Sequence, residues 1–223
     1  MLLILSLLAS LAAPAAMSQQ TETPMILGPG VYLKDELPEN ARGVWLGLIQ
    51  EQEDVWKLEQ VSVETRPVFL EGDKPDAPGG VRVFASENKR AMLFMRGLSL
   101  PASNTQVAKA WYQPAKTPGE QVITGTLGKG AFKVQGEATP GSDKVTVLFS
   151  WENRAQALCT LSDDEDSSWD ILWAGDLDGD DVPDFIFAIA EHDKGTQQLL
   201  LSGRARPGQI VGLVASHRYT FSD

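Results

Sequence analysis

Residues 175–184 read Gly-Asp-Leu-Asp-Gly-Asp-Asp-Val-Pro-Asp, and the apolar run Phe-Ile-Phe-Ala-Ile-Ala follows them over 185–190. Aspartates stand at positions 1, 3, 5 and 9 of the loop that begins with the second residue of this stretch. Ca²⁺ takes about six to eight oxygen ligands, and this spacing lets one short loop bring several carboxylates and the backbone carbonyl of position 7 around one ion. The sequence therefore predicts a Ca²⁺ site whose ligands are Asp176, Asp178, Asp180, the carbonyl of Val182, and Asp184.

The residues on either side of the loop decide which kind of calcium site it can form. An EF-hand requires a flanking pair of helices and a bidentate Glu at position 12, whereas position 12 here is Phe187. The runs 171–173 and 185–190 are short and apolar, as is typical of buried strands. The sequence thus predicts a strand, loop, strand unit in which Gly179 supplies the bend. The alternative is an acidic turn exposed to solvent, because Asp and Gly also dominate turns.

Residues 173–190 resemble the calcium loops of FG-GAP and VCBS-type repeats, which occur in integrin-like β-propellers and in many secreted bacterial proteins. The family pattern runs Gly-Asp-x-Asp/Asn-Gly-Asp-Gly-x-x-Asp before an apolar strand, and this chain departs from it at Asp181, where the family usually has Gly. The resemblance implies a structural calcium site that makes the loop rigid, and it does not imply catalysis. The loop occurs once, whereas a propeller needs about four or more blades, so we do not expect a complete propeller.

Most of the remaining chain alternates apolar and polar residues over short runs that turn residues separate, a pattern typical of sandwiches and barrels. Strands are expected at 43–48, 55–65, 81–85, 91–95, 106–112, 121–127, 131–135, 144–150, 155–161, 198–202 and 209–215. The predicted fold is therefore all-β, an antiparallel sandwich or barrel-like meander with one strand-loop-strand calcium site. We expect a β-rich body over 19–161 and a calcium-loop meander over 162–223, which can share one core with the body.

Residues 1–16 read MLLILSLLASLAAPAA, an uncharged and Leu-rich segment that ends in small residues. Its length and composition are typical of a secretory signal peptide, which we expect to cover residues 1–18. The apolar run is shorter than the roughly 20 residues that a membrane-spanning helix needs, so we expect no stable membrane insertion after cleavage. These features predict a secreted or periplasmic protein, and the alternative is an uncleaved N-terminal anchor.

The chain is acidic, with 19 Lys and Arg against 30 Asp and Glu and a formal net charge of −11. Nucleic acids and anionic lipid surfaces bind to basic footprints, so this composition argues against both as partners and suits a protein that attracts cations. Cys159 is the one cysteine of the chain, which excludes an internal disulfide. Its strand-like surroundings predict a small buried side chain rather than a reactive thiol.

Two further groups of polar residues are candidates for a second site. The acids at 163–166 can hold a second ion, but a charge run of this kind is more often a solvated loop. Glu191, His192 and Asp193 follow the apolar run and offer an acid, an imidazole and another acid. Neighbouring residues on extended backbone point to opposite faces, so these three side chains do not automatically converge. We therefore predict a solvated turn there and assign no catalytic residues.

Two functional classes remain open. The first is a binding module for a protein or glycan ligand, in which one structural Ca²⁺ stabilises the loop. The second is a secreted carbohydrate-active hydrolase with paired carboxylates, for which tryptophans would supply a sugar-binding platform. The chain has six tryptophans, at Trp45, Trp56, Trp111, Trp151, Trp169 and Trp173. Buried tryptophans would favour the module, and a groove with two acids and exposed tryptophans would favour the hydrolase.

Overall fold

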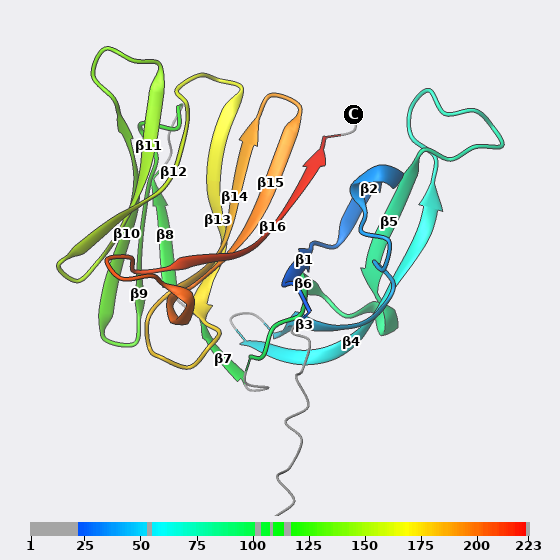
Figure 1. The fold of residues 1–223 in the computed structure, drawn as a ribbon, viewed down its shortest axis with the longest axis horizontal. Helices are drawn as coiled ribbons and strands as arrows, with labels where there is room; N and C mark the ends of the chain where they lie inside the picture. The colour runs from blue at the N-terminus through cyan, green and yellow to red at the C-terminus, as the bar shows by residue number, and fades with distance from the viewer. Residues whose placement is uncertain (1–21, 53–54, 101–103, 108, 114–116, 222–223) are drawn as a thin grey trace, which may run out of the picture.

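The computed structural model describes residues 22–52, 55–100, 104–107, 109–113 and 117–221. These residues form sixteen β-strands and three short 3-10 turns, with no α-helix among them. All pairings between these strands are antiparallel, and the strands make three sheets (Figure 1). The all-β prediction is confirmed. Within the described ranges, no helix is long and apolar enough to cross a membrane. The predicted signal segment 1–18 lies outside the described residues.

The N-terminal sheet is built from strands that precede residue 100, and it curls into a half-barrel (Figure 1). Its longest strand, β4 (Val55–Val68), pairs first with β3 (Gly43–Gln52) and then with β5 (Gly80–Ala85). The twist of a sheet accumulates along such a long strand, so the two partner strands, β3 and β5, point in different directions. The remaining strands of this sheet are β1 (Met25–Leu27), β2 (Gly30–Leu33) and β6 (Ala91–Arg96).

The other two sheets are meanders in which consecutive strands are neighbours. The five-stranded sheet consists of β8 (Lys109–Gln113), β9 (Val122–Leu127), β10 (Gly130–Ala138), β11 (Lys144–Trp151) and β12 (Arg154–Ser162). The C-terminal sheet consists of β13 (Ser167–Asp176), β14 (Asp184–Glu191), β15 (Lys194–Leu201) and β16 (Gly212–Thr220). The short strand β7 (Asn104–Val107) pairs with β4 on one side and with β13 on the other, and so joins the N-terminal and C-terminal sheets.

The C-terminal sheet is covered on both faces. Phe185 and Phe187 of β14 belong to a core shared with the five-stranded sheet, where they meet side chains such as Phe149. Ile186, between them, belongs to a second core shared with the N-terminal sheet, which includes Leu93. A strand buried on both faces has no polar side to present, so its sequence is a continuous apolar run instead of an alternating one. This explains the apolar residues at 185–187, whereas residues 188–190 are half-buried.

β13 crosses from one core to the other by means of a β-bulge. Ile171 lies in the core shared with the five-stranded sheet, and Trp173 lies in the core shared with the N-terminal sheet. Residues two apart on a regular strand point to the same face, but the pairing with β14 shifts by one residue between these two. The bulge thus turns the last residues of β13, and the loop that follows them, toward the junction of the three sheets.

A third core fills the half-barrel around Trp45, Phe94 and Val83, and Tyr219 of β16 packs against it.

The structure also contains strands that the pattern of the sequence did not predict, namely β1 and β2, which are short. The core shared by the five-stranded and C-terminal sheets joins residues on both sides of 161, such as Val147 and Trp169. The division of the chain after residue 161 stays a prediction.

Candidate metal centre

The acidic loop connects β13 to β14, as the sequence predicted. Asp176 ends β13 and Asp184 begins β14, and the last paired residues of the two strands are Gly175 and Asp184. The two strands therefore hold the first and last acids of the loop side by side. The side of β13 away from β14 is bounded by β7, which pairs with Asp176. The strand, loop, strand unit is confirmed.

The carboxylate of Asp176 orders the loop by accepting hydrogen bonds from three of its backbone N–H groups. One of its oxygens accepts hydrogen bonds from the backbone N–H groups of Gly179 (2.7 Å) and Asp180 (3.2 Å), and the other accepts one from Asp181 (3.0 Å). Gly179 has φ 86° and Asp181 has φ 63°. The second value lies in the left-handed region, which Asp tolerates better than most residues, so the departure from the family pattern keeps the local conformation that Gly would favour.

Asp184 is the most deeply buried acid of the group, with no exposed surface. Its Oδ2 accepts the backbone N–H of Leu177 (2.7 Å), and its Oδ1 accepts the backbone N–H of Ser202 (2.7 Å). Burial raises the pKa of Asp184 to about 7; the charge of Asp178 also raises it, whereas hydrogen bonds from Ser202 and Leu177 oppose the rise. A carboxylate in this position is costly to ionise unless a positive charge lies next to it.

Three of the predicted ligands converge. One carboxylate oxygen from each of Asp176, Asp178 and Asp184 lies within 4.8 Å of the other two. Burial raises the pKa of Asp178, and the neighbouring Asp180 and Asp176 carboxylates raise it further. Among the described residues, none of the ion pairs includes an acid of this loop. Three converging carboxylates without a basic partner fit a cation, because a cation would offset both their repulsion and their burial.

The other two predicted ligands are placed differently. Asp180 lies outside the group of three, and its Oδ1 accepts the backbone N–H of Val182 at 2.9 Å. Both of its carboxylate oxygens also contact the hydroxyl of Ser202, at 2.9 and 3.0 Å, so it faces the same segment as Asp184. The side chain of Val182 packs against the core shared with the five-stranded sheet. The role of its carbonyl as a ligand stays a prediction.

Ser202 is a part of this site that sequence reasoning missed. It follows β15 and is buried, and its Oγ lies 2.9 Å from Asp184 Oδ1 and 3.5 Å from Asp178 Oδ1, in addition to its contacts with Asp180. A hydroxyl has one hydrogen and can donate it to one acceptor at a time. Ser202 therefore connects the acids of the loop to the segment after β15 through hydrogen bonds.

Gly203, the next residue, brings its backbone against the loop. Its N–H donates to Asp178 Oδ2 at 2.9 Å, and a Cβ atom at this position would lie 2.5 Å from that oxygen. A side chain here would therefore displace Asp178. The sequence offers a Ser-Gly pair at 202–203, but such pairs are common in turns. The pairing of β14 with β15, whose last pair is Phe185 with Leu200, brings the connection after β15 against Asp184, and this pairing is visible in the structure alone.

The second acidic segment forms no comparable group. Asp163 accepts the backbone N–H of Gly119 at 3.2 Å, and Asp166 lies 3.8 Å from His192 Nδ1. Asp164 and Glu165 are exposed. Apart from the cluster at Asp176, Asp178 and Asp184, no set of three metal-ligating side chains converges among the described residues. A second ion at 163–166 stays an alternative that these contacts do not favour.

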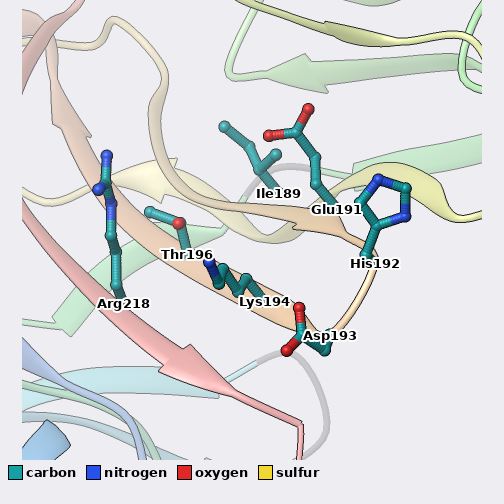
Figure 2. A pocket seen from close by; sticks show the side chains of 7 residues that line it. All are labelled: Ile189, Glu191, His192, Asp193, Lys194, Thr196 and Arg218. Carbon is teal, nitrogen blue, oxygen red and sulfur yellow. The ribbon is translucent and has the colours of Figure 1, made fainter.

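Glu191, His192 and Asp193 lie at the end of the hairpin formed by β14 and β15. They line a cavity of about 400 Å³ together with Lys194 and Arg218 among others, and Figure 2 shows their three side chains pointing in different directions. The His192 side chain is 69% exposed. This arrangement agrees with the predicted turn, since no acid and imidazole of this trio meet as a catalytic pair would.

The tryptophans bear on the choice between the two functional classes. Five of the six lie among residues whose burial is described, and they are between 1% and 9% exposed: Trp45, Trp56, Trp151, Trp169 and Trp173. Two of them use the indole N–H inside the protein, Trp45 toward Ala41 O and Trp169 toward Pro118 O, each at 3.0 Å. The side chain of Trp111 lies outside the described residues. The five buried rings serve the cores and form no sugar-binding platform.

Comparisons of the chain with protein-family models, with curated proteins and with solved structures find no match.

Proposed function

We propose that this protein is a secreted or periplasmic calcium-binding protein in which one structural Ca²⁺ holds the loop between β13 and β14. The observation that carries the proposal is the convergence of Asp176, Asp178 and Asp184 within 4.8 Å, with Asp184 fully buried. The three carboxylates, and the Ser202 hydroxyl that contacts two of them, offer oxygen, which hard cations such as Ca²⁺ prefer. The resemblance of residues 173–190 to FG-GAP and VCBS-type loops supports Ca²⁺ in particular.

Each residue of the proposed calcium site has a different role. Asp184 supplies a buried carboxylate and Asp178 a half-buried one, Asp176 orders the loop through its three backbone donors, and Ser202 adds a hydroxyl from the connection after β15. The ion would neutralise the carboxylates and tie the loop to that connection. An ion that binds the folded state alone adds about 2.7 kcal/mol to the free energy of unfolding when its free concentration is a hundred times the dissociation constant.

We further propose that the chain serves as a binding module rather than as a hydrolase. The burial of five tryptophans supports the module, because a hydrolase acting on carbohydrate would be expected to present some of them in a groove. The predicted signal at 1–18 supports the secreted or periplasmic location. In this proposal the role of the ion is structural, because it fixes a loop at the junction of the three sheets and keeps their relative positions.

The test is thermal unfolding of the protein in EDTA and across a Ca²⁺ series, with Mg²⁺ as the control ion. We expect saturating Ca²⁺ to raise the midpoint by about 5–10 °C, because about 1 kcal/mol corresponds to about 2–4 °C in a chain of this size. Asp178→Ala should abolish the rise. Asp76→Ala, which removes an exposed acid elsewhere, should preserve it. A midpoint that does not respond to Ca²⁺, or an equal response to Mg²⁺, would refute the proposal.

A further inference from the structure

The hairpin formed by β4 and β5 carries two arginines directly opposite each other. Arg66 of β4 pairs with Arg82 of β5 in the antiparallel register, so their side chains leave the same face of the hairpin. Both residues are exposed. Figure 1 shows this hairpin at one end of the long axis of the molecule, away from the loop between β13 and β14. The arginine pair is therefore separate from the candidate metal centre.

Like charges directly opposite each other on a sheet destabilise it, and this chain has a large excess of acids with which to avoid them. Two lysines in the same part of the chain do have an acidic partner: Lys57 and Lys89 each lie 3.0 Å from a carboxylate oxygen of Glu59. Arg66 and Arg82 have no ion pair or hydrogen bond through their side chains to any residue that the structure describes. Apart from the Phe84 ring beside Arg66, the hydrogen-bond donors of both guanidinium groups are therefore free to bind a carboxylate from outside the chain.

The surface around the two arginines is apolar. A cavity of about 550 Å³ lies over them and is lined by Arg66, Pro67, Val68, Phe69, Arg82 and Phe84. The Phe69 side chain is an exposed large hydrophobic group, with 58% of its surface accessible. The guanidinium carbon of Arg66 lies 5.6 Å from the centre of the Phe84 ring, a distance at which the ring attracts the cation.

The composition of this lining restricts what can bind. The guanidinium groups are its only side-chain hydrogen-bond donors, and it contains no hydroxyl, amide or carboxylate group that would satisfy the hydroxyls of a neutral sugar. Arginine and aromatic residues around a desolvated centre are the composition of protein-binding hot spots. A guanidinium fork binds a carboxylate through two parallel hydrogen bonds. Nucleic acid is disfavoured by the net charge of −11.

We propose that this face of the β4–β5 hairpin binds an acidic, extended segment of a partner protein. Carboxylates of that segment would pair with Arg66 and Arg82, and its apolar side chains would pack on Phe69 and Phe84. The bound carboxylates would offset the repulsion between the two arginines. Within the described part of the chain, no carboxylate pairs with either arginine. This assignment gives the binding module a partner of stated chemistry, and it does not depend on the metal centre.

The test is fluorescence anisotropy with a labelled peptide, Leu-Glu-Phe-Glu-Leu, titrated with the full chain, with Leu-Gln-Phe-Gln-Leu as its uncharged match. We expect saturable binding of the acidic peptide, at least tenfold weaker binding of the uncharged one, and a loss of at least tenfold for Arg82→Gln and for Arg66→Gln. Arg90→Gln, at an exposed arginine outside the lining, should change the affinity less than twofold.

Thermal unfolding of the same variants separates binding from structure. Arg82→Gln should leave the midpoint unchanged or raise it, since it removes a like-charge contact, whereas a structural arginine would lower it when replaced. Absence of saturable binding, or equal losses with Arg90→Gln, would overturn the proposal. Binding of a galacturonate hexamer at the arginine pair, without binding of the acidic peptide, would also overturn the proposal. The ligand would then be an anionic glycan. Removal of Ca²⁺ with EDTA should not affect peptide binding.

Discussion

The chain carries two acid-rich segments of similar charge, at 163–166 and at 176–184, and the fold gives them different surroundings. In the first, Asp164 and Glu165 face solvent and the acids follow one another without a gap. In the second, other residues separate the acids except at Asp180 and Asp181, two strands hold the ends of the loop together, and Asp184 is fully buried. The two segments therefore differ little in density of charge, and burial together with hydrogen-bond donors from another segment of the chain distinguishes 176–184 as the candidate metal centre.

The largest difference between the two segments should appear when one acid is removed from each. Asp184→Ala leaves the backbone N–H groups of Leu177 and Ser202 buried without an acceptor. We expect the free energy of unfolding in EDTA to fall by about 2–4 kcal/mol, because each unsatisfied buried donor costs about 1–3 kcal/mol. Asp164→Ala should change it by less than about 0.5 kcal/mol. Urea denaturation measures both, and equal effects would remove the distinction between the segments.

The dependence of stability on pH should be the next largest effect. The pKa of Asp184 in the folded protein is raised to about 7, above the value of about 3.9 for an unfolded chain. Between these values the folded state binds a proton that the unfolded state has released, so the free energy of unfolding falls as pH rises from about 4 to about 7.

In EDTA this fall should reach a few kcal/mol, since one unit of pKa corresponds to about 1.36 kcal/mol. Saturating Ca²⁺ should reduce it, because the ion favours the ionised carboxylate. Asp184→Asn removes the titrating group and should flatten the dependence in that pH range. Chemical denaturation at a series of pH values measures the effect, and a metal-free protein that grows more stable from pH 4 to pH 7 would contradict the raised pKa.

A smaller effect is expected from a substitution at Gly203, in the connection after β15 that contacts the loop. Gly203→Ala would place a Cβ atom 2.5 Å from Asp178 Oδ2 and so push that carboxylate from its position. We expect the affinity for Ca²⁺, measured by isothermal titration calorimetry, to fall about tenfold. Gly30→Ala is the matched control, since its new Cβ would meet the Tyr32 hydroxyl oxygen at an ordinary distance of 3.5 Å. Unchanged affinity in Gly203→Ala would mean that residues 202–203 lie outside the binding site.

Strands with one covered face were the easiest elements to predict. β11 buries every second residue, and this alternation is the signal by which half-buried strands are predicted. β14 was predicted through a continuous apolar run, but the reason for that run, a sheet covered on both faces, became visible only in the structure. β1 and β2 were missed because three or four residues are too few to show a period.

For the candidate site, the order of residues within 176–184 determined which carboxylates can meet, since they lie on one short loop whose ends two strands bring together. The apolar run after the loop likewise determined that a buried strand follows. Tertiary structure decided that Ser202 and Gly203 contact the acids of the loop, because the pairing of β14 with β15 brings the connection after β15 to Asp184 and Asp178. It also decided that Arg66 faces Arg82 across a hairpin turn of more than ten residues. Contacts of this kind depend on strand pairing between distant residues, and local sequence does not encode a register by itself.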